Sequence, residues 1–489
     1  METASVKPVL AIAVSLFGTL LIVAFRKKPN IRELCTFIIA FVKFGIIASM
    51  LPAVLAGSRL RCDLVDLLPG VGLAFRVDSL GLLFALVSSS LWIATSLYSV
   101  GYMRSLKEHS QTRYYAFFAL ALSSAVGVAF AGNILTLYLF YEMLSLSTYP
   151  LVTHHQDSEA RFAGRKYLTY LMGTSIGFFL PAVILTYYFS GTLNFTEQGI
   201  LTGAASDTML TVVFILYILG IGKAAIMPIH AWLPSAMVAP TPVSSLLHAV
   251  AVVKVGVFSV LRICLHVFGP YMMHDLSLNV FLLYFVSATI LLGSLFALKQ
   301  DNLKARLAYS TISQLSYIVL GGGLAGIIGI TGGILHIVMH AFGKITLFFC
   351  AGAIMVNTGL KNISEMRGIG RKMPVTMAAF FFGSLSIIGI PPLGGFWSKW
   401  YLALGCIQVD QIPILVVLLT SSLLNAAYFL PISYNAFFAD QDRYSEVREA
   451  PLLTVIPPVF TALVSFLLFI YPGVFLDLAK MTAQALLGG

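Results

Sequence analysis

The sequence predicts an all-α polytopic membrane protein with about 14 transmembrane helices. Of the 489 residues, 58% are hydrophobic and 10% are charged, and long uncharged runs recur from one end of the chain to the other. An apolar run of about 20 residues can cross a bilayer as a helix. Many such runs in one chain are typical of a polytopic helical membrane protein and exclude a soluble globular fold.

The segments follow in chain order. The first, at about residues 6–24, has no basic region before it and is followed by RKKPNIR, so we expect a retained transmembrane helix and not a cleaved signal peptide. Further apolar windows of about 20 residues continue along the chain. The windows are centred near residues 15, 46, 90, 122, 142, 178, 217, 255, 287, 315, 342, 387, 422 and 465.

Basic residues concentrate in alternate loops, after the first, third, fifth, ninth and eleventh segments. The positive-inside rule then places both termini outside, and the net charge of +10 reads as a topology signal, so no nucleic-acid partner is expected. Arg59, Arg61 and Arg76, after the second segment, are the main exception. Since no targeting sequence is recognised, we expect a bacterial or archaeal plasma membrane. The basic clusters are Arg26, Lys27, Lys28 and Arg32; Arg104, Lys107 and Arg113; Arg161, Arg165 and Lys166; Lys299, Lys304 and Arg306; and Lys361, Arg367, Arg371 and Lys372.

No cofactor or metal site is predicted. The five cysteines have no CxxC spacing and are expected to be packing residues. GGGLAG at residues 321–326 matches a dinucleotide-binding pattern but lies between apolar segments, so these glycines are expected to allow close helix approach instead. His336 and His340, four apart on one helix, cannot take opposite faces of one haem, and no acidic or cysteine ligand accompanies them.

An internal repeat is indicated by two similar segments. SSLLHAVAVVKVGVF begins at Ser244 and SSLLNAAYFLPISYN begins at Ser421. The displacement, 421 minus 244 or 177 residues, spans five segments, and an odd number inverts the second copy, as in many secondary transporters. Lys223 and Lys399 lie 176 residues apart, each in a segment rich in Gly and Pro that is expected to break its helix. The alternative is that the shared letters arise by chance.

Ionisable residues inside the apolar segments are the candidate functional site. Each costs at least about 2.5 to 3.5 kcal/mol when it faces lipid at bilayer depth, so these side chains must face protein or a wet cavity. Their spacing puts three of them in a column on one helix face. The residues are Glu142, Lys223, His248, Lys254, the column His336, His340 and Lys344, and Lys399.

These residues suggest a proton path. A lysine beside a movable glutamate can act as a proton switch, and we expect Glu142 and Lys223 to form such a pair. Lys254 and the histidine column would carry protons along the membrane plane, and Lys399 would deliver them to the other side. The alternative is a static ion pair with lysines that snorkel to the interface. Arg262 and Lys43, nearer helix ends, are expected to snorkel, and His154, His155 and His230 to be solvated.

Several segments resemble the signature sequences of one family. They are YEMLSLSTYPLV, GIGKAAIMPIHAWLPSAMVAPTPVSSLLHAVAVVKVGVF, QDNLKARLAYSTISQLSYI, LHIVMHAFGKITLFF and GIPPLGGFWSKW. Over about residues 75–440 the chain resembles the antiporter-like, proton-translocating subunits shared by respiratory complex I, Mrp cation/proton antiporters and membrane-bound hydrogenases. In length and in these signature sequences, the chain is most similar to the D-type Mrp protein. One complex I branch has glutamate where this chain has Lys399, and the long lateral helix of another branch is not expected.

The resemblance implies 14 helices, two inverted five-helix repeats, broken helices 7 and 12, and a central hydrophilic axis. Its divisions fall at residues 1–112 for helices 1–3, 113–268 for the first repeat, 269–440 for the second, and 441–489 for helix 14. The family's functional positions fall on Glu142, Lys223, Lys254, His336, His340, Lys344 and Lys399.

The sequence therefore predicts a proton-translocating subunit of a multisubunit membrane complex, with other membrane subunits, H⁺ and Na⁺ as partners. Mrp-type Na⁺/H⁺ antiport is the first expectation, and a proton-pumping subunit of a complex I-like oxidoreductase or hydrogenase is the alternative. No nucleophile, phosphate loop or cofactor motif is recognised, so bond chemistry is not expected of the chain itself. Two further alternatives are a non-conducting scaffold and a quinone-binding redox protein.

Overall fold

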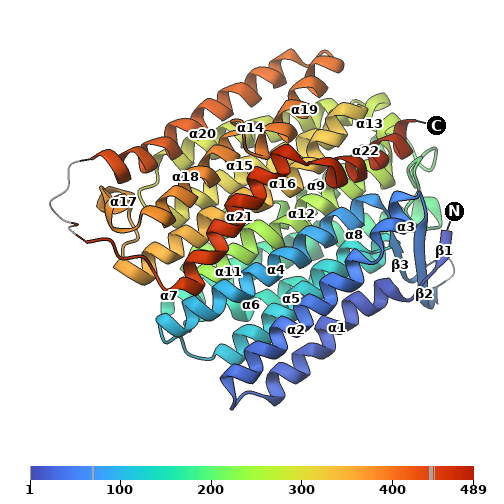
Figure 1. Ribbon diagram of the computed structural model, residues 1–489. Helices are drawn as coiled ribbons and strands as arrows, with labels where there is room; N and C mark the ends of the chain where they lie inside the picture. The colour runs from blue at the N-terminus through green and yellow to red at the C-terminus, as the bar shows by residue number, and fades with distance from the viewer. Residues whose placement is uncertain (1, 69–70, 440–443, 445, 489) are drawn as a thin grey trace.

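Long apolar helices lying side by side make up most of the computed structural model (Figure 1). The structure describes residues 2–68, 71–439, 444 and 446–488. Among them, nine helical segments are long and apolar enough to cross a membrane, and the prediction of a polytopic helical membrane protein is confirmed. These segments are Lys7–Ala24, Pro29–Leu55, Ser79–Ser105, Ser158–Ser190, Thr241–Phe268, Leu278–Lys299, Ile327–Thr358, Ile412–Phe438 and Leu452–Ile470.

The first half of the described chain carries the three named strands and the helices α1–α13. The elements are β1 (Glu2–Ala4), α1 (Lys7–Ala24), α2 (Pro29–Ala48), α3 (Leu51–Leu55), β2 (Arg59–Leu68), β3 (Val71–Val77), α4 (Ser79–Ser105), α5 (Gln111–Ala129), α6 (Ile134–Val152), α7 (Ser158–Thr174), α8 (Leu180–Ser190), α9 (Asp207–Gly220), α10 (Trp232–Ser235), α11 (Thr241–Ser245), α12 (Val252–Arg262) and α13 (Pro270–Asp275). Short π-helical turns at 175–179, 246–250 and 263–268 join or extend α7 and α8, α11 and α12, and α12.

Where it is described, the second half of the chain contains helices and no named strand. Its helices are α14 (Leu278–Lys299), α15 (Leu303–Gly323), α16 (Ile327–Thr358), α17 (Ile369–Lys372), α18 (Pro374–Ile388), α19 (Gly395–Gln408), α20 (Ile412–Phe438), α21 (Leu452–Ile470) and α22 (Gly473–Leu487). With joined helices grouped, the described elements are consistent with the fourteen expected crossings. Residues 441–489, expected to hold one helix, hold α21 and also α22. The predicted division between residues 440 and 441 lies outside the described residues.

Side-chain caps and glycines set several helix ends. Asp78, Asn133, Asp157 and Asn302 each accept a hydrogen bond from the backbone N–H three residues on, at the starts of α4, α6, α7 and α15. Such caps satisfy N–H groups that have no partner within the helix. α16 ends at Gly359, whose φ of +73° favours glycine.

A small three-stranded sheet was not expected from the sequence. β1 pairs in parallel with β2, and β2 pairs antiparallel with β3. Arg59 pairs with Glu197, and Arg61 pairs with acidic residues of β1 and β2. Arg76 donates to the backbone oxygen of Phe195. The three arginines that departed from the loop-charge pattern therefore have partners within their own end of the protein.

Both expected helix breaks are present. In the seventh segment α9 ends at Gly220, and one turn of 3-10 helix, Gly222–Ala224, carries Lys223. In the twelfth segment α18 ends at Ile388, the chain passes through Gly389 with φ +90°, and α19 begins only at Gly395. Because each break interrupts the backbone ladder, unpaired carbonyl groups become available to side chains.

Two segments form the centre of the bundle. Their apolar windows, in Thr241–Phe268 and in α16, are wholly buried, whereas the windows of α1 and α2 are only one-third buried. Both chain ends lie at the sheet end of the molecule (Figure 1): β1 belongs to the sheet, and Thr482 of α22 bonds to Ser79 at the start of α4. A polar, fully buried middle helix is possible only because other helices shield it from lipid.

Candidate functional site

Lys223 lies in the break of the seventh segment and is fully buried. Its ammonium nitrogen donates to the backbone oxygen of Tyr141 (2.9 Å) and to Ser145 Oγ (2.6 Å), both on α6. It also lies 3.2 Å from the centroid of the Tyr141 ring, an arrangement that favours a cation. The lysine is therefore held by neutral acceptors and by an aromatic face.

A glycine on α12 lets the backbone of this helix approach the break closely. A Cβ atom at Gly256 would lie 2.2 Å from the backbone of both Lys223 and Ala224. Only a residue without a side chain allows α12 to pack directly against the 3-10 turn. Lys254 lies two residues earlier on the same helix, about 200° around the axis, and its ammonium contacts α16 instead.

Lys254 and His340 are in direct contact. The Lys254 ammonium nitrogen lies 2.8 Å from His340 Nδ1, and both side chains are buried. The contact joins α12 to α16. His340 Nε2 has no hydrogen-bond partner among the described residues. One ring nitrogen of this histidine therefore binds an amine while the other is available to a further proton donor or acceptor.

The expected column of His336, His340 and Lys344 lies on α16, and all three side chains are buried. The two imidazole centroids are 5.9 Å apart, as expected for neighbours four residues apart on a helix. His336 Nδ1 lies 2.8 Å from Ser398 Oγ, and its Nε2 lies 3.2 Å from Gln314 Oε1. This column connects α15, α16 and α19 through polar atoms.

The last two lysines bind hydroxyl and carbonyl oxygens. Lys344 donates to Ser310 Oγ at 2.8 Å, and the same oxygen accepts a hydrogen bond from Tyr428. Lys399, half-buried and close to the second break, donates to the carbonyl oxygen of Ile388 (3.0 Å) and to Ser422 Oγ (3.1 Å). The carbonyl freed at the end of α18 is thus the acceptor that the helix break supplies.

Glu142 and His248 are the two members without partners. Both Glu142 carboxylate oxygens and both His248 ring nitrogens are buried and have no hydrogen-bond partner among the described residues. Within that part of the chain no ion pair joins Glu142 to Lys223, although Glu142 follows the residue whose carbonyl Lys223 binds. The expected direct pair is therefore absent in this arrangement, and Lys223 is bound one residue away from the carboxylate.

The electrostatic balance of these eight residues is unusual. They comprise four lysines, three histidines and a single carboxylate, and the acceptors of the lysines are hydroxyl, imidazole and carbonyl groups. A buried cation without a paired anion is costly, and the ordinary response is to give up a proton. The geometry therefore suits groups that change protonation more than it suits static ion pairs.

Three expectations at the segment ends are wrong. Lys43 does not snorkel: it is buried and donates to Ser15 Oγ and to the carbonyl of Leu122. Arg262 is also buried and forms a bidentate ion pair with Asp78. His154 is not solvated, since it is buried and stacks on His109 with 4.8 Å between ring centroids. Helix-end position alone did not reveal which neighbours would cover these side chains.

Sequence reasoning missed the neutral polar residues that support the site. Ser145, Ser310, Gln314 and Ser398 bind Lys223, Lys344 or His336 directly. A signal was available for two of them, because Ser310 and Gln314 are four apart in YSTISQLSY, a polar stripe within an apolar segment. Serines are common in membrane helices, however, and spacing alone does not identify their partners.

Sequence comparison matches most of the chain to known membrane proteins. A family model described as NADH:quinone oxidoreductase/Mrp antiporter, TM, matches residues 131–425. NADH-quinone oxidoreductase subunit N of Desulforudis audaxviator is 35% identical over 389 residues, covering 78% of this chain and 76% of that protein. The A-type protein of the Na(+)/H(+) antiporter of Alkalihalophilus pseudofirmus is 32% identical, with 83% of this chain but 54% of that protein covered. NAD(P)H-quinone oxidoreductase chain 5 of a Picosynechococcus species is 33% identical, with 67% of this chain and 50% of that protein covered.

Solved structures share the fold over nearly the full chain. A chain of the Mrp complex from Dietzia sp. has a TM-score of 0.88 at 23% identity, covering 99% of this chain and 98% of that chain. A chain of the membrane-bound sulfane sulfur reductase, an archaeal respiratory membrane complex, has a TM-score of 0.88 at 25% identity with the same coverage. The matched family model spans more than half of the 489 residues and includes all eight site residues. The chain belongs to the NADH:quinone oxidoreductase/Mrp antiporter transmembrane family.

Proposed function

We propose that the chain is a proton-translocating subunit of a multisubunit membrane complex. The observation that carries the proposal is a set of buried amine and imidazole groups held by neutral acceptors: Lys223 binds the Tyr141 carbonyl, Lys254 contacts His340, and His336 contacts Ser398. Imidazole and desolvated amines exchange protons near neutral pH, which hydroxyl and amide groups do not. Other membrane subunits are its partners, as in the complexes to which the similar chains belong.

Glu142 and Lys223 are the proposed switch. Lys223 now binds a carbonyl and a hydroxyl of α6, and the Glu142 carboxylate has no partner among the described residues. A small movement of the lysine towards the carboxylate would stabilise its charged form, and return to the Tyr141 carbonyl would favour proton release. His248 and Lys344 would extend the path, and Lys399 would stand at its far end.

The names of the relatives suggest an exchanged cation and an energy source, and both are proposals for this chain. Some relatives are named as parts of a Na(+)/H(+) antiporter, and others as parts of an NADH-quinone oxidoreductase. We favour Mrp-type exchange of Na⁺ for H⁺, and redox-coupled pumping in a complex I-like assembly is the second candidate. The relatives named above are of the N type, the A type and the chain 5 type, so the resemblance to the D-type Mrp protein stays a prediction.

The repeat and the orientation are also proposals. The two helix breaks, with Lys223 and Lys399 at or beside them, support inverted repeats at residues 113–268 and 269–440. The basic loops lie at the end opposite the sheet and the chain ends, which supports placing both termini outside a bacterial or archaeal plasma membrane. Residues 1–112 and 441–489 would flank the repeats.

The test is charge removal in the assembled complex. Lys223→Ala and Glu142→Ala should leave the complex intact, as judged by mass spectrometry of the purified assembly, and should abolish proton movement into membrane vesicles. Lys27→Ala, at an exposed lysine of a loop, is the matched control. Assembled mutants with normal proton movement would refute the switch and favour a non-conducting scaffold.

A further inference from the structure

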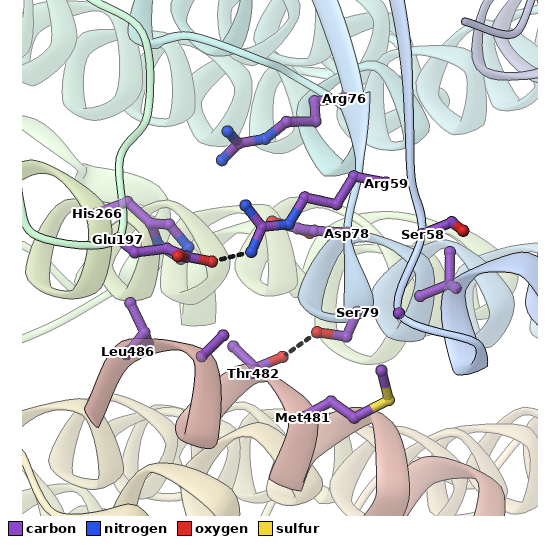
Figure 2. Close-up of a pocket in the computed structure, with 13 residues that line it drawn as sticks. Ser58, Arg59, Arg76, Asp78, Ser79, Glu197, His266, Met481, Thr482 and Leu486 are labelled. Atoms are coloured by element: carbon purple, nitrogen blue, oxygen red, sulfur yellow. Dashed lines mark hydrogen bonds and ion pairs between the residues drawn. The ribbon is translucent and has the colours of Figure 1, made fainter. Parts of the chain in front are cut away.

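A charged cavity lies at the sheet end of the molecule, away from the eight site residues. Its volume is about 170 Å³, and it lies between the sheet, the start of α4 and the last helix, α22. Figure 2 shows side chains from these elements converging on it, with Thr482 bonded to Ser79 on one side and Arg59 paired with Glu197 on the other. The titratable and charged residues that line it are Arg59, Arg76, Asp78, Glu197 and His266.

A buried ion pair forms the inner wall of this cavity. Arg262 binds Asp78 through both terminal nitrogens, one at 2.7 Å from Oδ1. Its Nη1 also lies 3.3 Å from His266 Nε2. Arg262 Nε and His266 Nδ1 are buried without a partner among the described residues. A purely structural pair leaves no reason for two unsatisfied polar atoms beside a cavity that is large enough for water.

One helix face connects this cluster to the proposed proton path. Lys254, Phe258 and Arg262 follow at intervals of four residues on α12, about 6 Å of rise per interval, and His266 lies in the π-helical turn that continues it. Phe258 packs against Phe84, with 5.1 Å between ring centroids, and Arg262 lies 5.2 Å from the Phe258 ring. Phe258 thus lies between Lys254 and Arg262 along this helix and contacts the guanidinium at the cavity end.

The opposite end of the same segment also opens to a cavity. That cavity has a volume of about 610 Å³, and it is lined by Thr241 and by charged residues of the basic-loop end, among them Asp157 and Lys304. The segment Thr241–Phe268 is thus wholly buried along its length and meets a polar cavity at each end. This is the arrangement that a path across the membrane requires.

We propose that the cavity lined by Asp78, Glu197 and His266 is the aqueous port through which the buried axis exchanges protons with the side of the membrane that the sheet faces. The inference rests on the proposed proton-translocating function and names its exit step. His266 takes up a proton on one ring nitrogen and releases it to cavity water, so only N–H and O–H bonds change. Arg262 stays charged and positions Asp78 and His266. Exchange at this face then runs along α12.

Cavity blocking tests the port directly. In a background with the two partly exposed cysteines replaced, Cys35→Ser and Cys62→Ser, Ala485→Cys places a thiol in the cavity wall, and Gln484→Cys places one on the same helix outside it. The assembled complex in vesicles is treated with a membrane-impermeant, positively charged methanethiosulfonate, and labelling is measured by mass spectrometry. Each variant's proton movement is compared with its own rate before treatment.

We expect labelling to reduce proton movement at least about tenfold in Ala485→Cys and to leave Gln484→Cys unchanged. Full labelling of Ala485→Cys without loss of transport, or failure of the water-borne reagent to reach it, overturns the port. Absence of proton movement before treatment, in the parent complex, would instead contradict the proposed function itself. The two failures are therefore distinguishable.

A substitution of His266, the proposed proton carrier, gives a second measurement. His266→Leu should reduce proton movement per assembled complex while the amount of assembled complex stays near that of the parent, and His266→Gln should not restore it, because glutamine cannot carry the proton. Equal rates in His266→Leu and parent, normalised to assembled complex, would also overturn the port.

Discussion

The ammonium nitrogen of Lys254 on α12 lies 2.8 Å from Nδ1 of His340 on α16, in the fully buried centre of the bundle. Either the lysine is charged and donates to a neutral imidazole, or it is neutral and accepts from the ring N–H. One hydrogen bond therefore serves both protonation states. Two helices far apart in the sequence are joined at the point where a proton can change carrier.

Replacing this lysine should interrupt translocation. Lys254→Met keeps much of the side-chain volume but removes the amine, so His340 loses its partner. We expect proton movement into vesicles, followed with a pH-sensitive dye, to fall at least about tenfold, in line with the loss of a positioned proton-transfer group. Lys28→Met, at an exposed loop position, should keep the parent rate. A parent-like rate in assembled Lys254→Met would contradict the path.

The close approach of α12 to the broken segment should be sensitive to one methyl group. Gly256→Ala places a Cβ 2.2 Å from the backbone of Lys223 and Ala224. Backbone atoms cannot move aside as the end of a flexible side chain can. Overpacking of this kind costs about 1–3 kcal/mol or more. We expect a lower Tm of the detergent-solubilised protein, together with weaker proton movement.

Gly45→Ala is the matched control for that change. Gly45 is also helical, but an added Cβ meets nothing within 4 Å. Alanine is the better helix former by about 1 kcal/mol. The Tm of this variant should be unchanged or higher, and an equal loss in both variants would show that the contact with Lys223 is not the cause.

The ion pair between Asp78 and Arg262 should matter far more than a similar pair at the surface. Asp78→Asn keeps an oxygen that can cap α4 but leaves Arg262 buried without its anion, at a cost of about 3–5 kcal/mol. Asp63→Asn removes a partner of Arg61, where both side chains are about half exposed, and should cost under about 1 kcal/mol. The Tm of each variant is compared with that of the parent. Equal decreases in Asp78→Asn and Asp63→Asn would refute the expected difference between the buried and the exposed ion pair.

Two adjacent histidines should give the stability opposite dependences on pH. Burial lowers the pKa of His154 to about 4 from its ordinary 6.5. The unfolded chain therefore binds the proton more readily, and stability is fully present above pH 6.5 and falls as the pH drops towards 4. A hydrogen bond to Glu108 raises the pKa of His155, so its contribution is fully present below pH 6.5 and is lost as the pH rises through the raised pKa.

Single substitutions separate these effects. His154→Gln should flatten the acid-side loss of Tm between pH 6.5 and 4. His155→Gln should lower the Tm below pH 6.5 and approach the parent as the pH rises through the raised pKa of His155. Burial opposes the ionisation of Glu108, yet its bond to His155 lowers its pKa, so this carboxylate stays ionised in the same range. Parallel Tm profiles for the parent and both variants would contradict the assignment.

The membrane-crossing helices and the ionisable residues within them could be predicted from the sequence, because both depend only on the order of residues along the chain. The helix breaks at Lys223 and near Lys399 follow from local Gly and Pro content, which acts on the backbone within a few residues. The column on α16 follows from helical periodicity alone. The small sheet was missed because no bilayer-length apolar pattern marks β2 and β3.

The hydrogen-bond and ion-pair partners of each charged side chain could not be predicted from the sequence. The sequence predicts a pair between Glu142 and Lys223, yet the lysine binds the Tyr141 carbonyl and Ser145. The sequence predicts that Arg262 snorkels to the interface, yet Asp78, 184 positions away in sequence, binds it in the interior. These choices depend on which helix faces meet, and that is set by packing between distant segments.

The sequence by itself determined that this chain crosses a membrane many times, where its helices break and which residues bring charge into the apolar interior, since each of these depends on neighbours in the chain. Only the tertiary structure decided that α12 and α16 share a hydrogen bond between Lys254 and His340, and that Arg262, Asp78 and His266 meet beside a cavity under α22. The physical reason is that the free energy of a buried charge depends on its nearest partners in space, and those partners come from segments up to several hundred residues apart.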